Sequence, residues 1–377
     1  MQLVAINWHI YILTGSALAL GLTGLARVVP LVAFSLVGGV FADAHDRRRL
    51  MIFTQSSMLV FAAALGLLTN VGWASVGVIY LLSALTAAAT AFDTPVRKAL
   101  PPNLVPKEHL ANAMSLTNLM QQAGSIVGPA LAGFVIAWKG VAAVYWINAA
   151  SFLAVILALL LIKLPTQENL GAVRLSLSSL WEGIRFVRRS EILYSTMVLD
   201  FFATFFSSAT ALLPIFARDI LHVGPEGMGM LYSAESIGAV GSGVGLSLRS
   251  HLKKQGALLL GAVAVYGAAT ALYGISQQFA LSFVLLMIVG AGDTVSTILR
   301  NTIRQIWTPD QMRGRMSGVN AIFISGGPQL GDLEAGLLAA AVGAPISVVV
   351  GGVATVVIVA LMAWKVPFLR NYQDENA

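Results

Sequence analysis

The chain has 377 residues, of which 57% are hydrophobic and only 11% are charged. Soluble globular domains carry about 25% charged residues, so this chain has too few charges to cover a water-facing surface of its size. A soluble enzyme, a disordered protein and a nucleic-acid-binding domain are therefore poor fits, and a multi-pass membrane protein remains. The absence of Cys rules out disulfides, thiol nucleophiles and Cys-ligated metals, and the five His residues show no metal-binding spacing.

Apolar runs long enough to cross a bilayer, which takes about 20 residues, recur along the whole chain. A shorter run, Leu3–Leu13, comes first, and from Met1 to Leu13 a helix rises only about 20 Å, as the second half of a span would. The runs do not alternate, so they predict helices and not barrel strands. We expect an all-α integral membrane protein with this half helix and eleven full spans at 16–42, 50–70, 75–99, 111–138, 141–162, 192–217, 228–248, 256–275, 280–301, 316–341 and 345–364.

The basic residues give this set of helices an orientation. With the half helix numbered 1, 20 of the 23 Lys and Arg residues, Arg300 and Arg304 among them, fall in even-numbered loops or in the C-terminal tail. The positive-inside rule then places those loops and both termini in the cytoplasm. The net charge of +6 is therefore a topology signal and a contact for anionic lipid, and not a nucleic-acid patch.

The longest polar stretch, 163–191, divides the chain into two halves of six helices. We expect bundles at 1–162 and 192–364, a cytoplasmic linker between them, and a cytoplasmic tail at 365–377. Within the linker, one helix face would be apolar and the other charged, which predicts either an amphipathic helix on the membrane surface or a plain linker helix. The apolar face would hold Leu177, Leu180, Trp181, Ile184 and Val187, and the charged face Glu182, Arg185 and Arg189.

The two halves resemble each other at a period near 200 residues. Asp93-Thr94 matches Asp293-Thr294, and Gly128-Pro129-x-Leu131 matches Gly327-Pro328-x-Leu330. Because six helices is an even number, both halves run in the same direction. Parallel repeats about an axis normal to the membrane are a recurring transporter plan, with the binding site between the halves near mid-depth.

The stretch from Gly39 to Arg48 resembles the loop 2–3 motif of the major facilitator superfamily, with Gly39, Asp43, Arg47 and Arg48 in place and Ala44 and Asp46 at two substituted positions. The resemblance implies a fold of two six-helix bundles. It also implies that Asp43 forms a cytoplasmic gate contact with Arg97 or, as second choice, with Lys98. A carboxylate at a helix N-terminus is favourable, and such a pair can break as the halves rock. Simple topology charge is the alternative interpretation.

Helix 5 resembles the antiporter motif of the same superfamily through Gly124, Gly128, Pro129 and Gly133, with Ala132 at one Gly position. In the family this motif accompanies export. Generic packing of small residues would explain the same string without any transport direction.

Longer strings, such as Leu13–Gly21 and Thr308–Arg315, resemble the enterobactin-exporter-like, drug-efflux branch over essentially the whole chain. Family members carry further residues before this point, so we expect that the sequence starts late and lacks the first half of helix 1. The resemblance implies a monomeric transporter in the bacterial inner membrane that takes a small-molecule substrate and no cofactor.

Ionisable residues inside a bilayer are costly and are candidates for function. The resemblance to the superfamily, in whose fold helices 1, 4, 7 and 10 line the cavity, implies that Asp200, Asp293 and Glu235 face the central cavity. There they would carry a proton or a cationic substrate, because burial disfavours a charged carboxylate and lets it exchange protons near neutral pH. Bonding to backbone or to Ser and Thr is the alternative. A second group, Arg27 with Asp332 or Glu334, would form an intramembrane ion pair.

These features predict a proton-driven efflux transporter for a small apolar or siderophore-like compound, working by alternating access. The chain has no ATP-binding G-x-x-x-x-G-K-[ST] string and no cluster that would make it an enzyme. A lysophospholipid or metabolite uniporter or importer, and a transport-inactive membrane scaffold, are the alternatives.

Overall fold

The structure is a computed structural model that describes residues 1–44, 46–162, 177–208, 210–248, 254–309 and 312–373. The described residues are helical almost throughout and contain no strand. By their contacts they form two compact units. Unit 1 comprises Met1–Gly15 and Leu25–Leu175, and unit 2 comprises Ser16–Gly24 and Ser176–Ala377.

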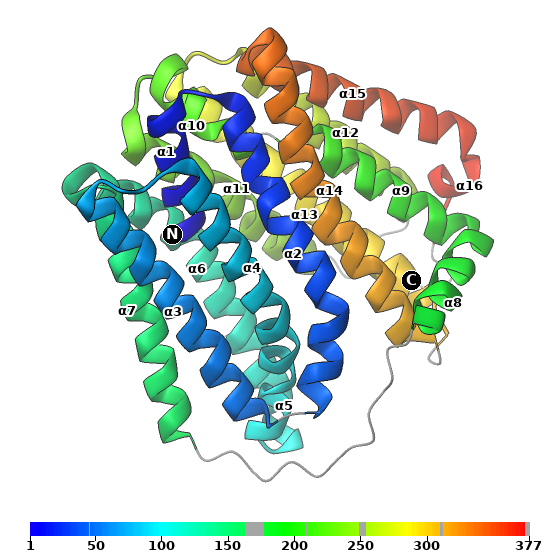
Figure 1. Cartoon of the computed structure of the whole chain (residues 1–377). Helices are drawn as coiled ribbons and strands as arrows, with labels where there is room; N and C mark the ends of the chain where they lie inside the picture. Colours follow the sequence, from blue (N-terminus) through cyan, green and yellow to red (C-terminus); the bar gives the residue numbers. More distant parts are fainter. Residues whose placement is uncertain (45, 163–176, 209, 249–253, 310–311, 374–377) are drawn as a thin grey trace. The chain divides into compact units, whose positions relative to one another are not determined.

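Unit 1 is built around α3, which packs against α7 and α4 (Figure 1). Side chains at the helix ends fix where these elements begin: Asp46 accepts a hydrogen bond from the backbone N–H of Arg49 at the start of α3, and Ser75 does so from Val78 at the start of α4. The helices of this part of the chain are α1 (Gln2–Thr14), α2 (Ala17–Ala44), α3 (Arg47–Val71), α4 (Val76–Ala99), α5 (Pro101–Leu104), α6 (Leu110–Lys139) and α7 (Val141–Leu161).

Unit 2 repeats this packing, with α12 in contact with α15 and α13 as α3 is with α7 and α4. The order of the two sets along the chain is that of the repeat seen in the sequence. The helices are α8 (Leu177–Arg189), α9 (Glu191–Phe206), α10 (Leu213–Ile215), α11 (Gly224–Ser247), α12 (Gln255–Ile275), α13 (Phe279–Trp307), α14 (Arg313–Val342), α15 (Ala344–Lys365) and α16 (Pro367–Arg370).

The start of α2 belongs to unit 2 because it lies directly on α14. A Cβ at Gly21 would meet the backbone of Asp332, and one at Gly24 the backbone of Gln329. Small residues permit such an approach of two backbones inside a membrane. Residues 16–24 therefore pack with the second unit, and the predicted bundle boundaries at 1–162 and 192–364 stay a prediction.

The predicted span 192–217 coincides with a candidate membrane span, Glu191–Ile220, whose helix is interrupted near its middle. The α-helix α9 ends at Phe206, Ser207 and Ser208 are not helical, and a 3-10 turn, α10 and a π-turn at Phe216–Ile220 follow. Pro214 has no N–H to donate and stands at the start of the second segment, where that costs nothing. The hydroxyls of Ser207 and Ser208 bond to neighbouring helices and stabilise the break.

Nine helices in the described part of the chain are long and apolar enough to cross a membrane. The Gly-rich α11 and the helix α14 coincide with the predicted spans 228–248 and 316–341 but are not among the nine, and α1 has only 13 residues. An all-helical membrane protein is thus confirmed. The number of twelve helices and the incomplete first helix stay predictions.

The helix expected in the linker is present as α8, which packs against α9 and α14. The side chains of Leu177 and Leu180, and residues 163–176, lie outside the described residues. Val187 is buried, whereas Trp181, expected on the same apolar face, is 67% exposed. Arg185 and Arg189 are exposed as well, so Trp181 stands beside basic side chains, an arrangement typical of a membrane interface.

Candidate functional site

A close crossing of α11 and α13 places two acidic side chains next to each other in unit 2. A Cβ at Gly238 would overlap the carbonyl group of Met287, and a Cβ at Gly290 would overlap that of Glu235. Only glycine permits this approach. Glu235 therefore lies against α13 at Gly290, three residues before Asp293, and the backbone geometry holds the two carboxylates on one side of the crossing.

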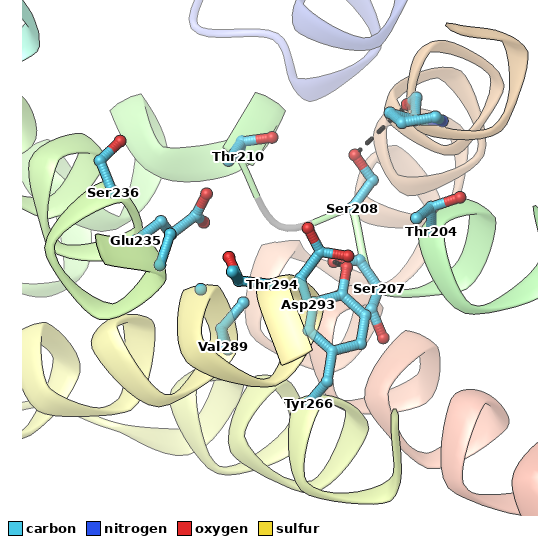
Figure 2. A pocket seen from close by; sticks show the side chains of 13 residues that line it. Thr204, Ser207, Ser208, Thr210, Glu235, Ser236, Tyr266, Val289, Asp293 and Thr294 are labelled. Carbon is cyan, nitrogen blue, oxygen red and sulfur yellow. Dashed lines mark hydrogen bonds between the residues drawn. The ribbon is translucent and has the colours of Figure 1, made fainter. Parts of the chain in front are cut away.

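Both carboxylates line a cavity of about 290 Å³ at the break between α9 and α10 (Figure 2). Seven hydroxyl-bearing side chains share the lining, and the residues lining this cavity in the described part of the chain include no basic side chain. The full lining is Thr204, Ser207, Ser208, Thr210, Glu235, Ser236, Ala239, Tyr266, Val289, Gly290, Asp293, Thr294 and Pro328.

Hydrogen bonds fix the wall formed by the break. Ser207 Oγ lies 2.7 Å from Thr355 Oγ1, and Tyr266 donates from its hydroxyl to the carbonyl oxygen of Ser207 over 3.3 Å. Ser208 donates to the carboxylate of Asp332. These bonds occupy the buried polar groups of an irregular segment, which would be costly in a membrane if they were left open.

Glu235 and Asp293 differ from these groups. Within the part of the chain that the structure describes, neither carboxylate has a hydrogen-bond or ion-pair partner. All the residues that line this cavity belong to unit 2, so the expected position of these acids on the central cavity between the two halves stays a prediction. Figure 2 shows the two side chains directed toward the space between α11 and the break. They are free to take a proton or a ligand.

Asp200 does not line this cavity and has a different partner. Arg300 donates from Nη1 to the Asp200 carboxylate and from Nη2 to Thr297 Oγ1 over 2.8 Å. Asp200 and Arg300 are 8% and 7% exposed. The sequence places Arg300 at the cytoplasmic end of its span, and in the structure it lies inside α13, which extends through Trp307. Its pairing with Asp200 is not predicted from the sequence. Its place seven residues after Asp293, on the same helix face, was the signal that could have revealed it.

A buried acid in unit 1 was also missed as a site residue. Asp93, the counterpart of Asp293, is 2% exposed and accepts hydrogen bonds from Thr54 Oγ1 at 3.1 Å and Gln55 Nε2 at 2.9 Å. Arg97 Nε lies 3.4 Å from its other oxygen. The repeat pointed to this position, but only the neighbouring helix reveals that its carboxylate is fully bonded.

The residues of the predicted cytoplasmic gate motif are only partly described. Gly39 lies in α2, and the side chain of Asp43 lies outside the described part of the structure, so the contact of Asp43 with Arg97 stays a prediction. Arg47 begins α3. Arg48 donates from Nε to the carbonyl oxygen of Leu159 over 2.9 Å and so binds the C-terminal end of α7, where a cation is favourable.

The antiporter-motif residues Gly124, Gly128, Pro129 and Gly133 all lie in α6. Gly133 is buried, whereas a Cβ at Gly124 would meet open space. The matching string in α14 has a clear packing role, because Gly331 lies against the end of α9 and Pro328 lines the cavity. The second copy of the motif thus supports the break between α9 and α10.

The expected intramembrane ion pair is not tested by the geometry. Asp332 accepts a hydrogen bond from Ser208, and Glu334, on the same helix α14, is half-buried. Arg27 belongs to unit 1. Pairing of Arg27 with Asp332 or Glu334 stays a prediction.

Comparison of the chain with known proteins identifies its family. The family model described as transmembrane secretion effector matches residues 1–376. The chain belongs to this family. As a transmembrane secretion effector it is a membrane transporter of the major facilitator superfamily and not an enzyme.

Two relatives of this chain are bacterial exporters. The multidrug efflux pump Tap of Mycolicibacterium fortuitum is 30% identical over 357 residues, which cover 91% of this chain and 86% of the pump. The enterobactin exporter EntS of Citrobacter koseri is 27% identical over 376 residues, 98% of this chain and 89% of the exporter. This chain is thus similar both to a multidrug efflux pump and to an enterobactin exporter.

Solved transporters share the fold. A bacterial homologue of the human lysosomal transporter Spinster, in an inward-facing and occupied conformation, matches with a TM-score of 0.74 at 15% identity, over 98% of this chain and 96% of that one. The nucleoside transporter NupG matches with a TM-score of 0.73 at 11% identity, over 96% and 95% of the two chains. At these identities the likeness extends to the fold only.

Proposed function

We propose that this secretion effector is a proton-coupled transporter that exports a small apolar or siderophore-like compound by alternating access. The observation that carries the proposal is a pair of carboxylates, Glu235 and Asp293, that have no bonded partner among the described residues and line a cavity at a broken helix. Discontinuous helices form ion and substrate sites in many secondary transporters. Carboxylates inside a membrane that carry no structural bond are the groups a proton relay needs.

In this mechanism the carboxylate pair is protonated in one direction of the conformational change and charged in the other. A protonated pair is neutral and can cross with an empty cavity, whereas a charged pair must be compensated before it moves through the low-dielectric interior. Loading a proton from outside and releasing it on the cytoplasmic side would therefore drive the return step. Alternating access of the two units around their cavity-facing helices completes the cycle.

Asp293→Asn removes the charge and keeps the shape of the side chain. In everted vesicles we expect the wild-type protein to accumulate the dye Hoechst 33342 or enterobactin when a proton gradient is imposed, and the Asp293→Asn variant to fall to the level of vesicles without the protein. Fluorescence of the dye and mass spectrometry of the siderophore measure the two substrates.

Asp219→Asn is the control for that experiment, because it makes the same change at an exposed residue of the π-turn. Unchanged proton-driven accumulation in Asp293→Asn would refute the proton role. Accumulation that ignores the gradient would favour a uniporter. The absence of transport of either probe would favour the scaffold alternative.

We also propose that the chain lies in the bacterial inner membrane as a monomer with its C-terminus in the cytoplasm, which the basic even-numbered loops support. Because the chain has no Cys, a single introduced thiol reports its own side of the membrane. A membrane-impermeant maleimide should label Gln373→Cys in everted vesicles only, and Trp73→Cys, in the exposed turn after α3, in right-side-out vesicles only. The reverse pattern would overturn the topology.

A further inference from the structure

We propose that the cavity of unit 2 binds an organic cation, an ammonium-bearing compound whose charge is held by Asp293 and Glu235. The inference rests on the proposed transport function and names the class of substrate within it. It narrows the range of substrates by excluding an anionic siderophore from this cavity. Four features of the two units support it, and they concern different residues.

The first feature is a difference between the two copies of one position. In unit 1, Asp93 accepts hydrogen bonds from Thr54 and Gln55 and pairs with Arg97, so its charge is compensated inside the fold. In unit 2, Asp293 has the same place in the repeat but no such partners among the described residues. The fold can satisfy a buried acid at this position, and in the second copy it leaves that acid open to a cavity. Asp293 is half-buried, and a carboxylate in such a place without an internal partner favours an external one.

The second feature is that Arg300, the buried basic residue of α13, already has bonded partners. Arg300 is bonded both to Asp200 and to Thr297 Oγ1, so its charge is already compensated. The cavity lining in the described part of the chain contributes two acids and no base. An anionic ligand would therefore meet repulsion, whereas a cation would compensate a charge that the fold leaves open.

The third feature is the backbone around the cavity. Ser207 and Ser208 follow directly on the C-terminal end of α9, where the helix dipole contributes partial negative charge. In broken transporter helices such ends and unwound carbonyls face cations. The dipole therefore adds to the field of the two carboxylates.

The fourth feature is the volume of the cavity together with the uncharged side chains that line it. A space of about 290 Å³ is too large for a bare metal ion and is at the lower end of the range for small organic ligands. Tyr266 offers an aromatic ring, which attracts ammonium groups, and the hydroxyls offer acceptors for a polar substituent. The cavity thus fits a small ammonium compound with an aromatic or hydroxyl-bearing part.

Two probes of the same shape isolate the charge. (4-Hydroxyphenyl)trimethylammonium and 4-tert-butylphenol differ only in the quaternary nitrogen that replaces a carbon. By isothermal titration calorimetry on the purified full chain in detergent, we expect the cation to bind about tenfold more tightly than the neutral probe, since bonds to charged groups discriminate by that order. Affinity for the cation should fall as pH is lowered, because protonation removes the charge of the carboxylates.

Matched variants assign the effect to the site. Glu235→Gln and Asp293→Asn should each reduce the affinity for the cation about tenfold and leave that for the neutral probe unchanged. Glu226→Gln, the same change at an exposed residue of the same helix, should bind as the wild type does. Size-exclusion profiles of the variants confirm that they are folded.

Equal affinity for the two probes, or cation binding that survives both substitutions together, would overturn the inference. So would tighter binding of the anion 2,3-dihydroxybenzoate than of the cation. Binding at equilibrium needs no gradient, so its outcome is separate from that of the vesicle experiment. Cation binding without proton-driven efflux would defeat the proposed function, and proton-driven efflux without charge preference would defeat this inference alone.

Discussion

Arg300→Met is expected to lower the free energy of unfolding by about 3–5 kcal/mol, because it leaves Asp200 as an unpaired charge in the interior of unit 2. Asp200 is 8% exposed, and Arg300 is its ion-pair partner. Methionine fills a similar volume, so the effect measures the lost charge more than a lost contact. Thermal unfolding of the purified protein in detergent, followed by tryptophan fluorescence, measures the change.

The second partner provides the control. Asp200→Asn in the Arg300→Met background removes the orphaned charge and should recover most of the lost stability, so that the double variant is more stable than Arg300→Met alone. A double variant that shows the sum of two independent losses would contradict a direct pair. Because neither residue lines the cavity, the double variant should still prefer the cationic probe.

The helices could be predicted from the sequence because their signal is local. A run of apolar residues long enough to cross a bilayer forms a helix wherever its backbone must bond to itself, and the helices α3, α7, α12 and α15 coincide with predicted spans within a few residues. The parallel repeat was visible for the same reason, since matching strings recur at a fixed spacing. The family could be inferred from short motifs within that frame.

The break between α9 and α10 could not be predicted from hydropathy, because the residues after Ser208 are as hydrophobic as those before it. It depends on the partners of two serines: Thr355 of α15 and Asp332 of α14 bond to Ser207 and Ser208. These partners are more than a hundred residues away in sequence. Pro214 was the one local signal, and a proline is also tolerated inside membrane helices.

The roles of the acidic residues depend on the same kind of distant contact. Asp200 and Asp293 are similar in sequence terms, since each is an acid near the middle of an apolar run. Arg300 compensates Asp200, whereas the glycines of α11 and α13 place Asp293 beside Glu235. Sequence identifies which acids are buried, and packing decides which of them are available to a ligand.

The glycine crossing that brings those two acids together gives the second large expected effect. Gly238→Ala should lower the free energy of unfolding toward the upper end of the ~1–3 kcal/mol range for overpacking. Its new Cβ would overlap the backbone carbonyl of Met287, and a backbone cannot rotate away as a side chain can. The two helices must separate, which also moves Glu235 away from Asp293. The temperature of thermal unfolding and the affinity for the cationic probe should therefore both fall.

Gly241→Ala distinguishes this cause from a general effect of replacing glycine in α11. A Cβ at Gly241 meets nothing within 4 Å, so the substitution should be neutral or stabilise the helix by up to about 1 kcal/mol through helix propensity. If Gly238→Ala were as stable as Gly241→Ala, the close crossing of α11 and α13 would be wrong. If it lost stability but kept the charge preference of the cavity, the crossing would stand, and the two carboxylates would bind the cation without needing that backbone to hold them together.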